Sequence, residues 1–160
     1  MREIIYNRYA AAEYAKKWAL SRNDEYYNFD SIGGDCTNFA SQCIYAGAKI
    51  MNFTPDTGWY YRSVNDRSAA WTGVEYLYKF LVNNKGAGPF AHTVAENEIR
   101  TGDIIQLGRN DGSFYHSLVV TQTAPHIRIS AHTYDSLNRR LDSYVYETIR
   151  YIHIDGVRAW

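Results

Sequence analysis

The chain has 160 residues, with seventeen basic and seventeen acidic side chains, so its formal net charge is zero. This balance argues against a nucleic-acid or membrane partner held by bulk charge. No apolar run reaches the roughly 18 residues that span a bilayer, and charged side chains interrupt the N-terminal segment, which does not resemble a signal peptide. Length and hydrophobic content predict one globular domain over residues 1–160, and nothing in the sequence indicates an oligomeric state.

Two helices are predicted near the N-terminus. Asn7 is placed to cap a helix over residues 7–21, whose apolar side chains recur at helical spacing. A second continuous apolar stripe predicts a helix over residues 36–46. Asp35 is in position to cap the start of this helix, and Gly47 is in position to end it.

The pattern changes from helix to strand along the chain. Residues 48–70 are predicted to form an irregular loop, long enough to suggest a functional role. Thr72 and Glu75 fit a capping box for a third helix over residues 73–83. Segments rich in β-branched and aromatic residues then predict four strands, at 102–108, 116–122, 126–133 and 143–155. Helices followed by strands indicate the α+β class with a mainly antiparallel sheet.

The stretch GGDCTNFASQCIYAG (33–47) holds the two cysteines of the chain. Seven residues of helix separate their Cα atoms by about 10 Å, beyond the reach of a disulfide, and the spacing matches no usual zinc pair. Cys43 lies inside the apolar stripe and is expected to pack as a small hydrophobe. Cys36 comes in the first helical turn, where free N–H groups and the helix dipole favour a thiolate and lower its pKa. Cys36 is therefore the candidate nucleophile.

A nucleophilic thiol needs a base, and the base needs an orienting group. If residues 123–125 form a three-residue hairpin loop, His116 falls opposite His132 on one polar face of the sheet. His116 would then act as acid and base, and His132 would orient it. A two-residue loop would instead place Ser117 opposite His132. Asp135 is the alternative third member, although its neighbours are typical of a turn.

These motifs resemble, in combination, those of a known family. The stretch 33–47 resembles the nucleophile motif of the bacterial "putative amidase domain" family, a branch of the papain-like cysteine peptidases similar in plan to the NlpC and CHAP cell-wall hydrolases. Residues 100–105 resemble the strand before the catalytic His in these families, and residues 115–120 resemble the His strand. Residues 129–133 resemble the following strand, where NlpC-type enzymes carry a third polar residue.

The resemblance implies a papain-like cysteine amidase or endopeptidase that acts on peptidoglycan peptides without a metal or organic cofactor. It also implies a secreted or cell-envelope location, while the chain itself leaves a cytoplasmic location open. The implied catalytic residues are Cys36, His116 and His132. Residues that are candidates for substrate contact are Asp35, Trp59, Tyr61, Trp71, Tyr115 and Ser117.

Two rival functions are compatible with the same residues. A Tyr-rich cleft on an inactive member of the fold would bind wall polymer without cutting it. A metal site is the second rival, and its donors would come from Cys36, His116, His132 or Asp135. Faster alkylation of Cys36 than of a free thiol near pH 6 would distinguish a catalyst from a binding module.

Overall fold

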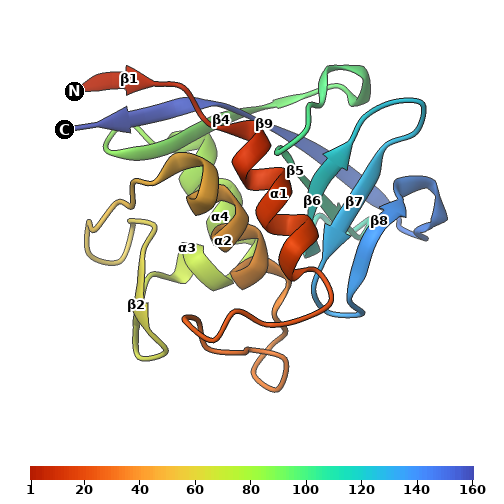
Figure 1. The fold of residues 1–160 in the computed structure, drawn as a ribbon, viewed down its shortest axis with the longest axis horizontal. Coiled ribbons are helices and arrows are strands. Elements are labelled where there is room, and N and C mark those ends of the chain that lie inside the picture. The colour runs from red at the N-terminus through yellow and green to blue at the C-terminus, as the bar shows by residue number, and fades with distance from the viewer.

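A computed structural model describes all residues from 1 to 160. Its main feature is a seven-stranded antiparallel sheet in the order β1-β9-β5-β6-β7-β8, in which β4 also pairs with β9. The strands are β1 (Arg2–Ile4), β4 (Gly88–Val94), β5 (Ile104–Gly108), β6 (Phe114–Gln122), β7 (Arg128–Ala131), β8 (Ser136–Arg140) and β9 (Thr148–Ala159). The two termini lie side by side where β1 pairs with β9 (Figure 1).

Four helices gather on one side of this sheet (Figure 1). They are α1 (Arg8–Trp18), α2 (Cys36–Ala48), the single turn α3 (Ala69–Thr72) and α4 (Val74–Asn83). Two short 3-10 turns, Glu96–Glu98 and Leu141–Ser143, join strands elsewhere. The predicted α+β class with a mainly antiparallel sheet is confirmed.

The first two helices begin where their sequences predict. The Asn7 side chain accepts a hydrogen bond from the Ala10 amide at 3.0 Å, as an N-cap does. Helix α2 begins at Cys36 but runs past Gly47 to Ala48, and the next residue, Lys49, ends it with a left-handed φ of 60°. Gly47 lies inside α2, where its missing side chain allows close packing, since a Cβ there would lie 2.6 Å from the Asn7 carbonyl oxygen.

The predicted capping box of the third helix is wrong. Helix α4 begins at Val74 after Gly73, which makes no side-chain cap, and Thr72 belongs to the preceding turn. Glu75 instead pairs with Arg150 of β9 at 2.9 Å. The Glu75 carboxylate thus binds a cation of the sheet in place of the local backbone amide that it would accept from in a capping box.

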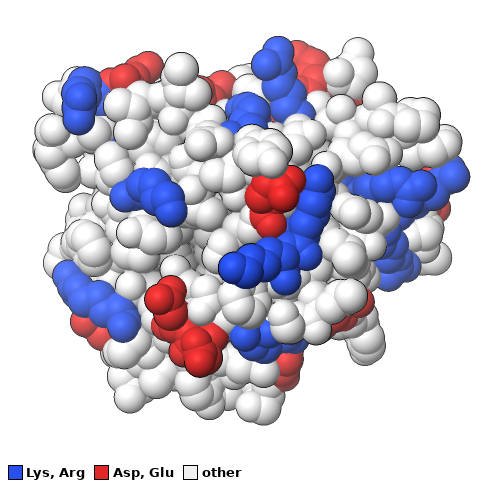
Figure 2. Space-filling model, in the orientation of Figure 1, with Lys and Arg blue, Asp and Glu red and all other residues white.

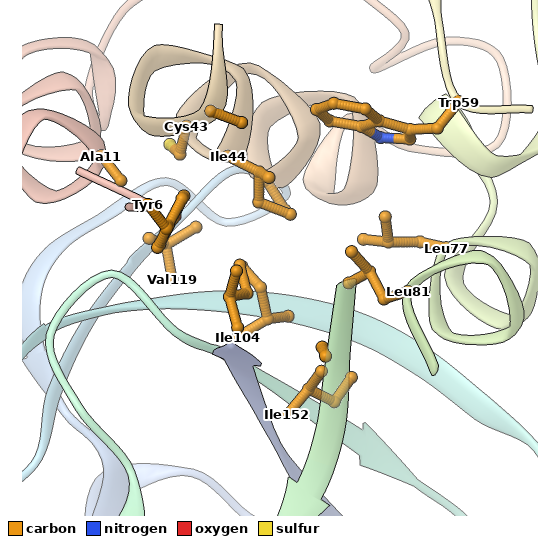
Figure 3. Packing of buried hydrophobic residues seen from close by; sticks show 14 of the residues in the cluster. Tyr6, Ala11, Cys43, Ile44, Trp59, Leu77, Leu81, Ile104, Val119 and Ile152 are labelled. Carbon is orange, nitrogen blue, oxygen red and sulfur yellow. The ribbon is translucent and has the colours of Figure 1, made fainter. Parts of the chain in front are cut away.

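The sheet carries a hydrophobic cluster on each face. On the helix side, Ile104, Val119 and Ile152 pack against side chains of the covering helices, which include Cys43, Ile44, Leu77 and Leu81 (Figure 3). The opposite face holds a smaller cluster that includes Ile105, Leu118, Val120 and Ile129. Alternate residues of a strand therefore belong to different clusters, as the pleat requires.

Three strands of the large sheet were not expected from the sequence: β1, β4 and β8. Strand β4 begins with Gly88-Pro89, and β8 reads SLNRR, so neither shows the apolar alternation that predicts a strand. The predicted loop over 48–70 contains a small hairpin of β2 (Tyr61–Ser63) and β3 (Asp66–Arg67). None of the helices has the length and apolarity that crossing a membrane demands. Acidic and basic side chains are interspersed over the face drawn in Figure 2.

Candidate active site

Cys36 is the first residue of α2, and only 8% of its surface is exposed. Its sulfur lies 3.8 Å from the Thr37 hydroxyl, and the backbone amide of Ser117 donates toward it. The Thr37 hydroxyl in turn bonds that of Ser117 at 3.0 Å. The start of the cysteine helix is therefore joined to β6 at the residue that follows His116.

The electrostatics of Cys36 differ from the prediction. Burial raises the pKa of the thiol, the Ser117 amide and Thr37 oppose that rise, and the charge of Asp35 adds to it. The expectation that the helix start lowers this pKa is wrong, because desolvation outweighs the local donors. The resting residue is a thiol.

His116 lies near the start of β6, and 9% of its surface is exposed. Its ring centroid is 6.1 Å from that of Tyr144, and no hydrogen bond joins the ring to Cys36. Burial, followed by the charge of Arg139, lowers the pKa of His116 to about 4. The imidazole is therefore neutral at pH 7 and able to accept a proton.

The predicted hairpin register is wrong by one residue. Val119 pairs with Ser130, so the same register continued along the strands places Ser117, not His116, opposite His132. The loop is two residues longer than predicted, over 123–127, because Gln122 pairs with Arg128, and a register irregularity between Val120 and Gln122 then takes back one residue. The net shift of one residue gives the alternative in which Ser117 faces His132.

This register places His116 and His132 on opposite faces of the sheet. His116 shares its side of β6 with Leu118 of the helix-free face, whereas His132 shares its side of β7 with Ser130, the partner of Val119 on the helix face. A direct contact between the two imidazoles is therefore not formed. His132 does not orient His116 in this structure.

His132 instead makes a buried pair with Asp35. Its Nδ1 lies 2.5 Å from Asp35 Oδ2, its Nε2 lies 2.7 Å from the Trp18 carbonyl oxygen, and its ring stacks on Phe39. Both partners are acceptors, so each ring nitrogen donates, which is the pattern of an imidazolium facing a carboxylate. The Trp18 carbonyl ends α1, where the helix dipole favours a cation.

Asp35 is fully buried and serves the loop before Cys36 rather than the helix start. Its carboxylate accepts from the Phe29 amide at 2.8 Å and from Asn38 Nδ2 at 2.9 Å, and it makes no side-chain cap. Burial by itself would raise the pKa of Asp35, but the hydrogen bonds from His132, Phe29 and Asn38 outweigh it and lower the pKa. Asp35 thus fixes the backbone on both sides of Cys36, and its burial leaves it no surface for a substrate amine.

Asp135, the other candidate for the third position, is also engaged. Its two carboxylate oxygens accept from Arg22 at 2.8 and 2.9 Å, on the surface. His132 and Asp135 therefore both have other partners. No three of the cysteine, histidine and acidic side chains form a group that could hold a metal ion.

The aromatic and polar candidates divide between core and surface. Trp59 and Trp71 have no exposed surface, and their indole N–H groups bond Ser41 and Asn38, so neither lines a cleft. Ser117 is buried between Thr37 and Gln106. The Tyr61 hydroxyl accepts from the Tyr27 amide. Tyr115 is 39% exposed beside His116 and remains a candidate for substrate contact.

Two residues near His116 were missed from the sequence. Tyr144 follows the 3-10 turn Leu141–Ser143, and Arg139 of β8 lies over its ring with the guanidinium carbon 3.7 Å from the centroid. Nothing in their spacing indicates a site, because only the tertiary pairing of β7 with β8 brings them to His116.

Comparison with known proteins assigns the chain to a family. Residues 5–154 match the family described as "Putative amidase domain". The chain belongs to this family. The family description indicates hydrolysis of amide bonds.

Two curated relatives come from Bacillus subtilis, and both are uncharacterized proteins. YhbB is 33% identical over 143 residues, which cover 86% of this chain and 45% of YhbB. YjcM is 28% identical over 144 residues, which cover 83% of this chain and 32% of YjcM. The chain thus spans less than half the length of either relative. No solved structure matches the chain significantly.

Proposed function

We propose that this domain is a papain-like cysteine amidase that cleaves amide bonds in bacterial cell-wall peptides, with Cys36 as nucleophile and His116 as acid and base. The observation that carries the proposal is that Cys36 begins α2, where the hydroxyl of the next residue, Thr37, bonds that of Ser117, the residue after His116, at 3.0 Å. A cysteine nucleophile at a helix start and a histidine that takes its proton are the two groups that acyl transfer needs.

The titration of the two residues favours a neutral thiol and a neutral imidazole at rest. In the proposed reaction His116 takes the thiol proton as the sulfur attacks the amide carbon, and then gives that proton to the leaving amine. Water hydrolyses the resulting thioester. The backbone N–H of Cys36 is one of the four amides that a helix start leaves unpaired, so it is the natural donor to the developing oxyanion.

The choice of substrate rests on the resemblance of the motifs to cell-wall hydrolases and on relatives of bacterial origin. A peptidoglycan substrate implies that the domain acts outside the cytoplasm or at the cell envelope. Neither catalysis nor binding in this proposal uses a metal or an organic cofactor.

The test compares Cys36→Ala with Cys43→Ala on purified peptidoglycan and on small peptide amides, with products identified by mass spectrometry. Cys43 is the matched control, because it is a buried cysteine of the same helix, two turns away. We expect Cys36→Ala and His116→Gln to lose turnover by at least about 1,000-fold and Cys43→Ala to keep it. Equal turnover in Cys36→Ala and wild type would overturn the mechanism.

A second candidate is a wall-binding domain that does not catalyse. The observation that favours it is the raised pKa of Cys36 together with a His116 ring that no other side chain orients. An alkylation experiment distinguishes the enzyme from the binding domain. The rate at which iodoacetamide alkylates Cys36 is followed over pH 5–9 in wild type and in His116→Gln. An enzyme shows a rate that depends on His116, whereas a binding domain shows the slow rate of an ordinary buried thiol in both proteins.

A further inference from the structure

We propose that Arg139, supported by Tyr144, binds a carboxylate of the substrate beside the scissile amide, so that the domain selects acidic peptides. This inference rests on the proposed function, because it assigns the substrate class of the same site. Three features of the helix-free face around His116 carry it.

The first feature is that Arg139 is held in place. Its Nε donates to the Ser143 hydroxyl at 2.8 Å, its Nη2 donates to the Ser143 carbonyl oxygen at 3.2 Å, and its guanidinium lies over the Tyr144 ring. Two hydrogen bonds and a cation–π contact leave the guanidinium little freedom. Its Nη1 has no partner, and a fork held in this way is suited to a carboxylate.

The second feature is that this cation has no counter-ion. No ion pair in the protein includes Arg139, whereas the next residue, Arg140, is paired with Asp142 at 2.6 Å. Arg139 pairs with Ile129, whose side chain belongs to the cluster on the helix-free face, so Arg139 projects from the face that His116 also uses. The charge of Arg139 already acts on His116, whose pKa it helps to lower.

The third feature is an unused donor next to the cation. The Tyr144 hydroxyl is closed off from solvent and makes no hydrogen bond. A buried hydroxyl without a partner is costly, and such a group calls for a specific explanation. A carboxylate seated at Arg139 would accept from the guanidinium and, after a shift of the whole Tyr144 side chain, from this hydroxyl.

A bound carboxylate would also make the His116 imidazole more basic. It neutralises the one cation that depresses the pKa of His116, so the imidazole becomes a stronger base only when a substrate of the right charge is present. The same contact therefore selects the substrate and prepares the residue that accepts the thiol proton.

The experiment uses peptides of alanine and lysine that differ only by Glu or Gln at one position, moved stepwise across the scissile bond. Turnover is measured with wild type, and binding is measured by calorimetry with Cys36→Ala, which retains the proposed pocket. We expect one position at which Glu is preferred to Gln by about 10- to 100-fold in both readouts. Arg139→Gln should bring that ratio close to one, and Arg139→Lys should restore part of it.

Arg140→Gln is the matched control, because it removes the same charge from the opposite side of the same strand. Tyr144→Phe should reduce the Glu preference by a smaller factor than Arg139→Gln does. Cleavage with no Glu preference at any position, or a preference that survives Arg139→Gln, would overturn the inference and leave the proposed function intact. A preference in binding to Cys36→Ala without any cleavage by wild type would overturn the proposed function and retain only the carboxylate-binding role of Arg139.

Discussion

His116 makes the stability of this domain depend on pH in a way that one substitution can reveal. Its pKa is about 4 in the folded protein, against an ordinary value of 6.5, because burial opposes the charged ring. The unfolded chain therefore binds the proton first as the pH falls. The contribution of His116 to the free energy of unfolding is fully present above the unfolded pKa of about 6.5. It declines as the pH falls from 6.5 to about 4 and does not change further below that.

The magnitude follows from the two pKa values. A pKa difference of about 2.5 between the folded and unfolded states corresponds to about 3 kcal/mol of stability. Between pH 7.5 and 4.5, about 2–3 kcal/mol of this stability should be lost. The assay is urea unfolding of wild type and His116→Gln at both pH values. Other groups titrate in the same range, so the quantity of interest is the difference between the two proteins in their loss of stability. We expect wild type to lose about 2–3 kcal/mol more than the variant.

His126→Gln is the control, because His126 is exposed in the loop between β6 and β7. This variant should lose as much stability as wild type over the same range. Identical losses in wild type and His116→Gln would refute the reasoning, since they would mean that the folded protein protonates His116 as readily as the unfolded chain does. The same low pKa predicts that any activity dependent on neutral His116 persists down to about pH 5.

Two further substitutions test the packing around the helix start. Cys43→Ala removes a fully buried sulfur from the core and should lower the free energy of unfolding by about 1 kcal/mol in urea titrations, with the reactivity of Cys36 unchanged. A loss of Cys36 labelling in that variant would show that the two thiols are not independent. His132→Ala removes the shorter of the two ion pairs of the buried Asp35 carboxylate, leaves only Arg22 at 3.5 Å, and should cost about 3 kcal/mol, measured in the same way. Little change in stability would mean that Asp35 is protonated in the folded protein.

The parts of the fold that the sequence predicted well are those with a strong local signal. Helix α2 carries a continuous apolar stripe, and Asn7 caps α1 through a bond to a residue three positions away. Strands β5 and β6 have the apolar composition of a buried strand. In each case the information lies within one element, so the pattern is sufficient.

The missed parts depend on partners that are distant in sequence. Strand β8 has few apolar residues and forms because it pairs with β7 at the edge of the sheet. The hairpin register depended on a longer loop and on an irregularity between Val120 and Gln122, which together moved every pairing beyond them by one residue and placed His116 and His132 on opposite faces of the sheet. A side-chain period of two makes such an error change the face of every residue on the strand.

The same logic explains why the third member of the site was not found by spacing. His132 has the position of an orienting residue, but its two nitrogens are occupied by Asp35 and the end of α1. Asp35 precedes a helix and so has the position of a cap, yet its carboxylate is used across the fold, on a residue nearly a hundred positions away. A histidine can orient a catalytic base or pair with a carboxylate, and an aspartate can cap a helix or pair with a cation. The buried pair gives each of these two charged groups the partner that it needs away from water. Burial decides between the roles, because a charge excluded from water must find its counter-charge, whereas a helix start at the surface can be capped by water.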